Sequence, residues 1–333
     1  MEELKNDILD LIEPTTNKTI REAKALSFFD IDTENDIVKM ELLVEEKNEA
    51  VENLRKEIVK LVKIKYKHRG IKIDISERKV HDSIFNSNVK VIGIISGKGG
   101  VGKSSIAANI AYRFTKKGYQ TALIDADIYG SSIPELLNIP HQQVYGNDEQ
   151  KIIPINYEGL EIMSTDFFTE NHEPVIWRGA MLNNMLNYFF FQTAWNKATR
   201  VVIIDFPPGT GDIMLDINSY LDKPSMLLIT TPHKASAGVA VKAGIASQKM
   251  NQNILGIVEN MSYYQDKETK KKHYIFGKDG GKNISQTLGV EMIAEIPIEV
   301  PKNNNCLYDL TQTAGQAIDD IVDYLIYQLD IKK

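Results

Sequence analysis

Residues 90–115 read KVIGIISGKGGVGKSSIAANIAYRFT, and this stretch decides the class of the fold. An apolar run, VIGIIS, comes first, and a helical pattern begins near Ser105. The segment between them consists of Gly97, Lys98, Gly99, Gly100, Val101, Gly102, Lys103 and Ser104. A strand, a turn with this glycine and lysine spacing, and a helix together predict a phosphate-binding loop.

The residue types of this segment suit a nucleotide. Glycines let backbone N–H groups converge on an anion, and the start of the helix adds partial positive charge. We expect Lys103 to reach the β- and γ-phosphates of ATP, and the Ser104 hydroxyl to bind Mg²⁺. The predicted ATP-binding residues of the loop are Gly97, Lys98, Gly99, Gly100, Val101, Gly102, Lys103, Ser104 and Ser105. The alternative, a glycine-rich turn without a ligand, is disfavoured by the strand before it and the helix after it.

Acidic residues follow two further apolar runs. Asp125 and Asp127 end the run TALIDAD, and Asp205 ends VVIID, in the manner of a Walker B strand. Carboxylates at strand ends near a phosphate site suit Mg²⁺ and its water shell, so Ser104, Asp125 and Asp205 are the predicted metal residues. The alternative for the aspartate pair is a role as helix caps.

The apolar runs also predict the architecture. VIGII, TALIDA, VVIIDF, MLLITT, ILGIV and MIAEIPI are too continuous for half-exposed strands, and helical stretches separate them. This pattern predicts an α/β fold with a doubly wound, mostly parallel sheet over residues 90–333. Ligands of such sheets bind at the carboxyl ends of the strands, where the residues above fall.

Residues 1–79 read as a separate, small α+β domain. Leu4, Ile8, Leu11 and Ile12 recur at helical spacing, residues 38–44 alternate as a strand, and residues 51–62 form the apolar face of a second helix. Gly70 is expected to end that helix, before a strand over residues 71–75. Residues 80–89 have mixed polarity and read as a linker.

Composition limits the partners and the compartment. The net charge is −6, from 39 basic and 45 acidic residues, which argues against a nucleic-acid partner. One cysteine, Cys306, fits a reducing compartment. The first ten residues do not resemble a secretory signal, and no apolar run approaches the roughly 18 residues of a membrane span. We therefore expect a cytoplasmic protein without a membrane partner.

The motifs together resemble those of the Mrp/ApbC family of iron–sulfur cluster carrier ATPases, which have a deviant Walker A loop. The matching strings, in family order, are GKGGVGKS, DADIYGSSIP, VIWRG, DFPPGTGD, TTP, VENMSYY and IFGKDGG. Residues 1–79 resemble, more weakly, the small iron–sulfur-assembly domain that often precedes this ATPase domain. The resemblance implies a homodimer that hydrolyses ATP with Mg²⁺ and works with iron–sulfur assembly or client proteins.

The same resemblance assigns roles to single residues. Lys98 would cross the dimer interface to the partner's nucleotide, and Asp127 would orient the attacking water, so the predicted catalytic residues are Lys98, Lys103 and Asp127. Asn260 would bind the adenine and Pro297 would pack on it. The turn over residues 207–212 would act as a second switch, and Trp177, Arg178 and Gly179 would make a dimer, switch or packing contact.

This chain departs from the family at the cluster ligands. Family members carry a Cys-x-x-Cys pair after ENMSYF, where this chain has Asp266 and Thr269. Neither is a soft sulfur ligand, and Cys306 lies far along the chain, so the sequence argues against a bound iron–sulfur cluster. Lys270, Lys271, Lys272 and His273 follow, either as a solvated hairpin tip or as a contact for an acidic partner or nucleic acid.

Three functions compete. The first is an ATPase that acts in iron–sulfur cluster assembly or transfer, which the resemblance favours. The alternative is an ATP-gated regulatory switch that binds a macromolecular partner, for example in gene regulation, without carrying a cluster. A partitioning ATPase is disfavoured by the strings DFPPGTGD and WRG.

The last helix, within residues 314–333, has several aspartates, which anionic lipid would repel, so we expect it to pack onto the domain.

Overall fold

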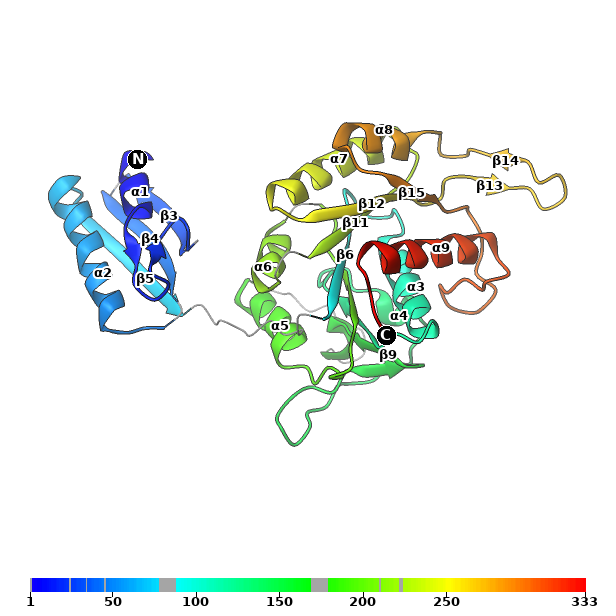
Figure 1. The fold of residues 1–333 in the computed structure, drawn as a ribbon, viewed down its shortest axis with the longest axis horizontal. Helices are drawn as coiled ribbons and strands as arrows, with labels where there is room; N and C mark the ends of the chain where they lie inside the picture. Colours follow the sequence, from blue (N-terminus) through cyan, green and yellow to red (C-terminus); the bar gives the residue numbers. More distant parts are fainter. Residues whose placement is uncertain are drawn as a thin grey trace. The chain divides into compact units, whose positions relative to one another are not determined.

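The computed structural model describes residues 2–23, 25–33, 35–44, 46–77, 88–168, 179–209, 211–221 and 224–333. The chain forms two compact units, Met1–Asp82 and Ser83–Lys333 (Figure 1). Of the linker predicted over residues 80–89, only Asn88 and Val89 lie within the described residues. Each unit has its own hydrophobic core.

The first unit is built on a three-stranded sheet. β4 (Ile37–Val44) lies in the middle, with β3 (Leu26–Asp32) antiparallel and β5 (Gly70–Glu77) parallel to it. Alternate residues of β4 are buried, since only one face of the sheet meets the core. α1 (Glu2–Leu9) and α2 (Glu49–Lys60) contribute to that core, and a π-helical turn, η1 (Leu61–Lys65), continues α2.

Two details of this unit differ from the sequence prediction. Leu11 and Ile12 lie beyond the helix, which ends at Leu9, and Ile12 is 53% exposed in a short hairpin of β1 (Ile12–Glu13) and β2 (Lys18–Thr19). The carboxylate of Glu13 accepts hydrogen bonds from the backbone and hydroxyls of Thr15 and Thr16, which closes this hairpin's turn. Gly70 does not end the second helix but begins β5, where its N–H donates to the Asp36 carbonyl.

The second unit contains an eight-stranded sheet, which confirms the predicted fold class. Its strands, in spatial order, are β15 (Met292–Glu295), β12 (Asn253–Glu259), β11 (Ser225–Thr230), β6 (Lys90–Ser96), β10 (Val201–Asp205), β7 (Thr121–Asp125), β9 (Leu160–Met163) and β8 (Ile155–Tyr157). All neighbours are parallel except β8, which runs antiparallel to β9 at the edge. The sequence analysis missed β8 and β9, which lack a long apolar run.

Helices cover both faces of this sheet, as its continuously apolar strands require (Figure 1). α3 (Lys103–Lys116), α4 (Ile133–Leu136) and α9 (Thr313–Gln328) share one core with the sheet. α5 (Gly179–Phe191), α6 (Asp212–Tyr220), α7 (Lys234–Lys249) and α8 (Gly280–Leu288) share the core on the other face. A short helical turn, η2 (Thr165–Phe168), follows β9.

Two surface elements bear on the predictions. α9 packs onto the domain as expected, and Lys117 pairs with Asp319 at 3.0 Å and with Asp323 at 2.8 Å. A hairpin of β13 (Tyr264–Gln265) and β14 (Lys272–His273) projects from the unit between β12 and α8 (Figure 1). In the described part of the chain, no helix combines the length and apolar character needed to cross a bilayer.

Candidate functional site

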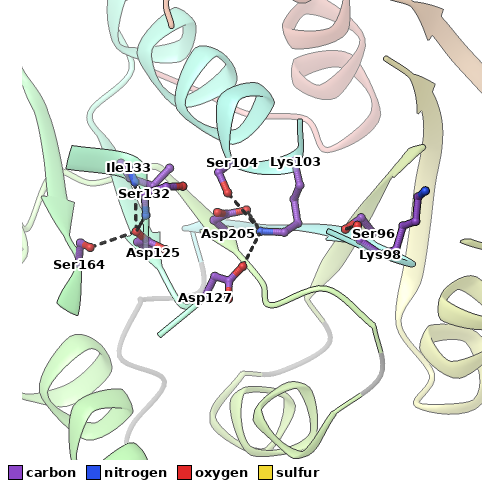
Figure 2. Close-up of polar contacts among 10 residues, drawn as sticks. All are labelled: Ser96, Lys98, Lys103, Ser104, Asp125, Asp127, Ser132, Ile133, Ser164 and Asp205. Atoms are coloured by element: carbon purple, nitrogen blue, oxygen red, sulfur yellow. Dashed lines mark hydrogen bonds and ion pairs between the residues drawn. The ribbon is translucent and has the colours of Figure 1, made fainter. Parts of the chain in front are cut away.

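The predicted site residues gather at the carboxyl end of three neighbouring strands. β10 lies between β6 and β7, and Asp205 is the register partner of Asp125, so their side chains start side by side. The glycine-rich loop leaves β6 at the same edge and enters α3. Figure 2 shows Lys103, Asp127 and Asp205 pointing toward one another.

The loop has a shape that glycine alone permits at two positions. Gly102 has φ +84°, and a Cβ there would lie 2.2 Å from the Asn260 amide nitrogen. A Cβ at Gly97 would lie 2.4 Å from the backbone of Val239 and Ala240 on α7. The loop is therefore packed between α7 and the end of β12, with exposed Gly99 and Gly100 at its turn.

Lys103 is the centre of the polar network. Its Nζ lies 2.6 Å from Asp205 Oδ1, 3.4 Å from the Ser104 hydroxyl and 3.6 Å from Asp127 Oδ2 (Figure 2). The Lys103 side chain is 6% exposed, that of Asp205 is fully buried and that of Asp127 is 16% exposed. A buried lysine between carboxylates is held as their counter-ion, because either charge alone would be costly in a dry interior.

Asp125 and Asp205 have little solvent around them. Burial raises the pKa of both carboxyl groups, and the Lys103 charge opposes this for each of them. Asp125 Oδ2 accepts hydrogen bonds from the Ser164 hydroxyl and from the backbone of Ser132 and Ile133 at the start of α4. The other oxygens, Asp125 Oδ1 and Asp205 Oδ2, are buried without a hydrogen-bond partner among the described residues.

These two unpartnered oxygens fit a hydrated cation. Buried acceptors are normally satisfied, and carboxylate and hydroxyl oxygens are the ligands that Mg²⁺ prefers. Asp205 Oδ2 and the Ser104 hydroxyl together offer oxygen ligands of this kind beside the glycine-rich loop. One oxygen of Asp125 accepts the backbone N–H groups at the start of α4, which is the helix-cap role given above as the alternative for this residue. The metal role of Asp125 stays a prediction.

Lys98 differs from Lys103 in its exposure and in the direction of its side chain. It is exposed, and its side chain points away from Lys103 and the carboxylates (Figure 2). Its backbone carbonyl accepts a hydrogen bond of 3.1 Å from the Ser96 hydroxyl, which fixes the loop but leaves the ammonium group outside it. Within one copy of the chain, the structure therefore does not bring Lys98 to Lys103 and Asp127, the other two residues predicted to be catalytic.

Asn260 and Pro297 belong to two segments that backbone hydrogen bonds join at the end of β12. The Asn260 amide donates 2.9 Å to the Val101 carbonyl, so it contacts the phosphate-binding loop itself. Pro297 is buried, and backbone bonds from Ser262 to Ile296 and from Ile298 to Tyr263 join its segment to the end of β12. The adenine contacts of both residues stay predictions.

The predicted switch turn begins beside the loop. The N–H of Gly209 donates 2.9 Å to the carbonyl of Ser96, the last residue of β6. Thr210, Trp177 and Arg178 lie outside the described residues, so their predicted roles stay predictions.

Residues 266–269, aligned with the cysteine pair of the resembled family, form a turn that internal hydrogen bonds close. Asp266 Oδ1 accepts hydrogen bonds from the Glu268 N–H, and from the N–H and hydroxyl of Thr269 at 2.7 and 2.8 Å. These bonds hold the pKa of the Asp266 carboxyl below its usual value. The two residues that replace the cysteine pair therefore satisfy each other as a hydrogen-bonded turn.

Cys306 is partly buried and packs against the core that α3 shares with the sheet. Burial raises the pKa of its thiol to about 12. Its backbone carbonyl accepts 2.8 Å from the amide of Asn109, and its N–H donates to Leu136. Because the thiolate is the ligand form, a metal at Cys306 would have to displace this proton from a buried sulfur.

Two residues at the site were missed by sequence analysis. Ser164 binds Asp125, and Asn109 ties the loop of Cys306 and Tyr308 to α3. Asn109 had a signal, since it is a polar residue on the otherwise apolar, buried side of SIAANIAYRF. Ser164 had none, because its contact joins strands far apart in sequence.

Residues 88–321 match the ParA family model described as the NUBPL iron-transfer P-loop NTPase. The chain is 35% identical to the iron–sulfur cluster carrier protein of Bacillus subtilis over 246 residues, which are 72% of this chain and 69% of that protein. It is 37% identical to the carrier protein of Aquifex aeolicus, with 63% and 57% covered, so it spans less than two thirds of that relative. It is 33% identical to the iron–sulfur cluster transfer protein NUBPL of Dictyostelium discoideum, with 63% and 65% covered.

Solved structures show the same fold. The chain resembles a nucleotide-binding protein from Archaeoglobus fulgidus in complex with ADP, at 29% identity and a TM-score of 0.55, covering 72% of this chain and 88% of that one. It also resembles the MinC:MinD cell division complex of Aquifex aeolicus, at 22% identity and a TM-score of 0.53, covering 72% and 96%. The second likeness concerns the fold alone.

Proposed function

The chain belongs to the ParA family of NUBPL-type iron-transfer P-loop NTPases, and from this premise we propose that it hydrolyses ATP as a homodimer in iron–sulfur cluster assembly or transfer. The observation that carries the proposal is the position of Lys103, whose ammonium group lies between Asp205 and Asp127 at the mouth of the glycine-rich loop. The relative from Archaeoglobus fulgidus that holds ADP supports a nucleotide at this loop.

In the proposed hydrolysis, separate residues bind the phosphates, hold Mg²⁺ and orient the attacking water. The backbone N–H groups of residues 97–105 and the start of α3 bind the phosphates, and Lys103 leaves Asp205 to reach them. Ser104 and Asp205, with Asp125 behind them, would hold Mg²⁺, which supplies positive charge to the phosphates when bound. Asp127, the most exposed of the three carboxylates, orients the attacking water.

A second copy of the chain completes the site in this proposal. The outward direction of Lys98 supports a role in trans, since an exposed ammonium group beside the loop is free to reach a neighbouring nucleotide (Figure 2). It would add positive charge where charge develops on the phosphates, as an arginine finger does. Asn260 and Pro297 would bind the base.

The cluster is the cargo in this proposal, and the names of the relatives from Bacillus subtilis and Dictyostelium discoideum support it. A cluster that bridges two copies through thiolates does not fit this chain. Its single cysteine, Cys306, has a pKa of about 12, and Asp266 and Thr269 already bind each other. We therefore assign the thiolate ligands of the cargo to a partner protein rather than to this chain.

A transfer assay tests the proposed function. A glutathione-coordinated 2Fe–2S complex serves as donor and an apo-ferredoxin as acceptor, under anaerobic conditions. We expect wild-type protein with Mg-ATP to accelerate the appearance of holo-ferredoxin several-fold, and Lys103→Ala to give no acceleration. If wild type with Mg-ATP does not change the transfer rate, the role in cluster transfer is wrong even where ATP is hydrolysed.

Anaerobic reconstitution tests the assignment of the cluster ligands. Wild type and Cys306→Ser are incubated with ferrous iron and sulfide, desalted, and compared by absorbance and by iron content per dimer. We expect no stable bridging cluster in either protein, because four thiolates are needed and the hairpin of Asp266 and Thr269 offers none. About four irons per dimer in both proteins would contradict this assignment.

An ATP-gated switch that binds a macromolecule without a cluster is the second candidate. The self-satisfied turn of Asp266 and Thr269 favours it, since the loop holds its shape without a metal. This candidate predicts ATP hydrolysis with no effect on transfer to the apo-ferredoxin, so the transfer assay distinguishes the two.

A further inference from the structure

The β13–β14 hairpin carries charge of the opposite sign to the rest of the chain. Residues 263–278 contain five lysines and two acidic residues, whereas the whole chain has a net charge of −6. The lysines are Lys267, Lys270, Lys271, Lys272 and Lys278. Every residue from Lys267 to Asp279 is exposed, and none of the five lysines forms an ion pair within the described residues. The hairpin is therefore a concentrated basic surface on an acidic protein.

The tip of the hairpin is held in one shape. Asp266 closes the turn through Thr269, and the Gln265 side chain donates 3.0 Å to the Lys270 carbonyl. Lys270 itself has φ +57°, and its N–H donates to the Asp266 carbonyl. The lysines of the tip are thus presented by an ordered turn, which lowers the entropy cost of binding a partner.

Apolar side chains are exposed next to the lysines. Ile275 is 62% exposed and Phe276 is 44% exposed, just after β14, and Tyr264 and Tyr274 are 39% and 37% exposed. Large exposed apolar side chains beside a charged rim are typical of a protein-binding surface. We propose that this hairpin surface, residues 263–278, docks an acidic polypeptide segment that also carries apolar residues.

The position of the charges favours a polypeptide over a membrane. A loop that inserts into a bilayer has apolar residues at its tip and lysines at its flanks. Here the tip, residues 266–271, is polar and charged, and Ile275 and Phe276 lie on the return toward α8. An inserted tip would bury its charges in lipid and leave the apolar pair behind.

The aromatic rings favour a polypeptide over nucleic acid. Binding of single strands relies on bases that stack on free aromatic faces. The ammonium group of Lys272 lies 3.7 Å from the centroid of the Tyr263 ring, and that of Lys278 lies 4.5 Å from the Tyr274 centroid. These cations cover one face of each of the two rings and reduce the ring area open to stacking, whereas the exposed Ile275 beside them suits an apolar side chain and offers no aromatic face to a base.

The base of the hairpin is hydrogen-bonded to the segment around Pro297, one of the predicted nucleotide-binding residues. Tyr263 accepts 2.7 Å from the Ile298 N–H, and Ser262 donates to Ile296, on either side of Pro297. Asn260, two residues before Ser262, holds the phosphate-binding loop. The hairpin is therefore connected, through residues 260–263, to the segment that contacts the phosphate-binding loop.

Peptide binding tests the docking surface without nucleotide, so its failure is separate from any failure of the ATPase or transfer assays. The probe is a fluorescein-labelled peptide, EELFEEEELFEE, measured by fluorescence anisotropy against the full chain. We expect saturable binding that weakens as salt is added. Charge reversal of Lys267, Lys270 and Lys271 to glutamate is expected to weaken it about tenfold, since three attractive charges become repulsive.

Matched variants separate the hairpin from general charge. Lys197→Glu/Lys242→Glu/Lys249→Glu makes the same charge change at exposed lysines outside the hairpin, and binding should stay within about twofold of wild type. Ile275→Ser should weaken binding, whereas Ile245→Ser on α7 should not. Equal affinities of the two triple variants, or no saturable binding by wild type, would overturn the proposal.

Other occupants are tested in the same format. An oligodeoxythymidylate of the peptide's length, and vesicles of phosphatidylcholine with phosphatidylserine, replace the peptide. Tighter binding of either one, lost in the hairpin variant, would assign the surface to nucleic acid or to lipid instead and overturn the polypeptide assignment. A hairpin variant that changes the oligomeric state but not peptide binding would assign it to a second copy of the chain.

Discussion

Lys103→Ala is expected to abolish ATP hydrolysis and also to destabilise the protein before any nucleotide is added. Its Nζ is 2.6 Å from buried Asp205 and 3.6 Å from Asp127. Removing one partner of a buried pair leaves an uncompensated charge, which costs about 3–5 kcal/mol of unfolding free energy. Turnover should be lost because the Lys103 charge at the β- and γ-phosphates is removed. Among the described residues, no other cation pairs with Asp205 or Asp127 and could take its place. Phosphate release and chemical denaturation measure the two effects.

Two controls identify the cause of the destabilisation. Lys116→Ala removes another lysine of α3, whose pair with Glu158 is exposed, and should cost less than about 1 kcal/mol. Adding Asp205→Asn to Lys103→Ala removes the stranded charge and should recover part of the lost stability. Normal turnover in a folded Lys103→Ala protein would refute the assignment of the nucleotide site.

Lys98→Ala should have the second large effect, of a different kind. The side chain is exposed and contacts none of the carboxylates, so stability and ATP affinity should stay near those of wild type. Turnover should fall by about 10³-fold or more, as when an arginine finger is removed. Lys249→Ala, an exposed lysine on α7, is the matched control and should leave turnover unchanged. Equal loss of ATP binding and turnover would place Lys98 on the bound nucleotide of its own copy.

Much of this site was predictable because its signals are local. The spacing from Gly97 to Ser104 is read directly from neighbouring residues, and it fixes the turn between a strand and a helix. Asp125 and Asp205 each end a buried run, and parallel register brings such ends to one edge of a sheet. Both inferences follow from the order of residues along the chain and do not require knowledge of how side chains pack.

The features that sequence analysis missed depend on contacts between distant segments. The bond of Asn260 to Val101 joins residues far apart in the chain, and it gives Asn260 a role on the loop rather than on a base alone. Ser164 binds Asp125 across two strands in the same way. Ile12 is an exception: spacing assigned it to a helix, whereas the local hydrogen bonds from Thr15 and Thr16 to Glu13 close a hairpin turn there.

The central claim is that ATP is hydrolysed at a site shared by two copies of this chain. Mixing Lys98→Ala protein with Asp127→Ala protein tests it most directly, because each is expected to be inactive alone. A mixed dimer has one site with both groups intact, so phosphate release should return to a substantial fraction of the wild-type rate. If no activity returns although mixed dimers form, Lys98 acts within its own copy and the shared site is wrong.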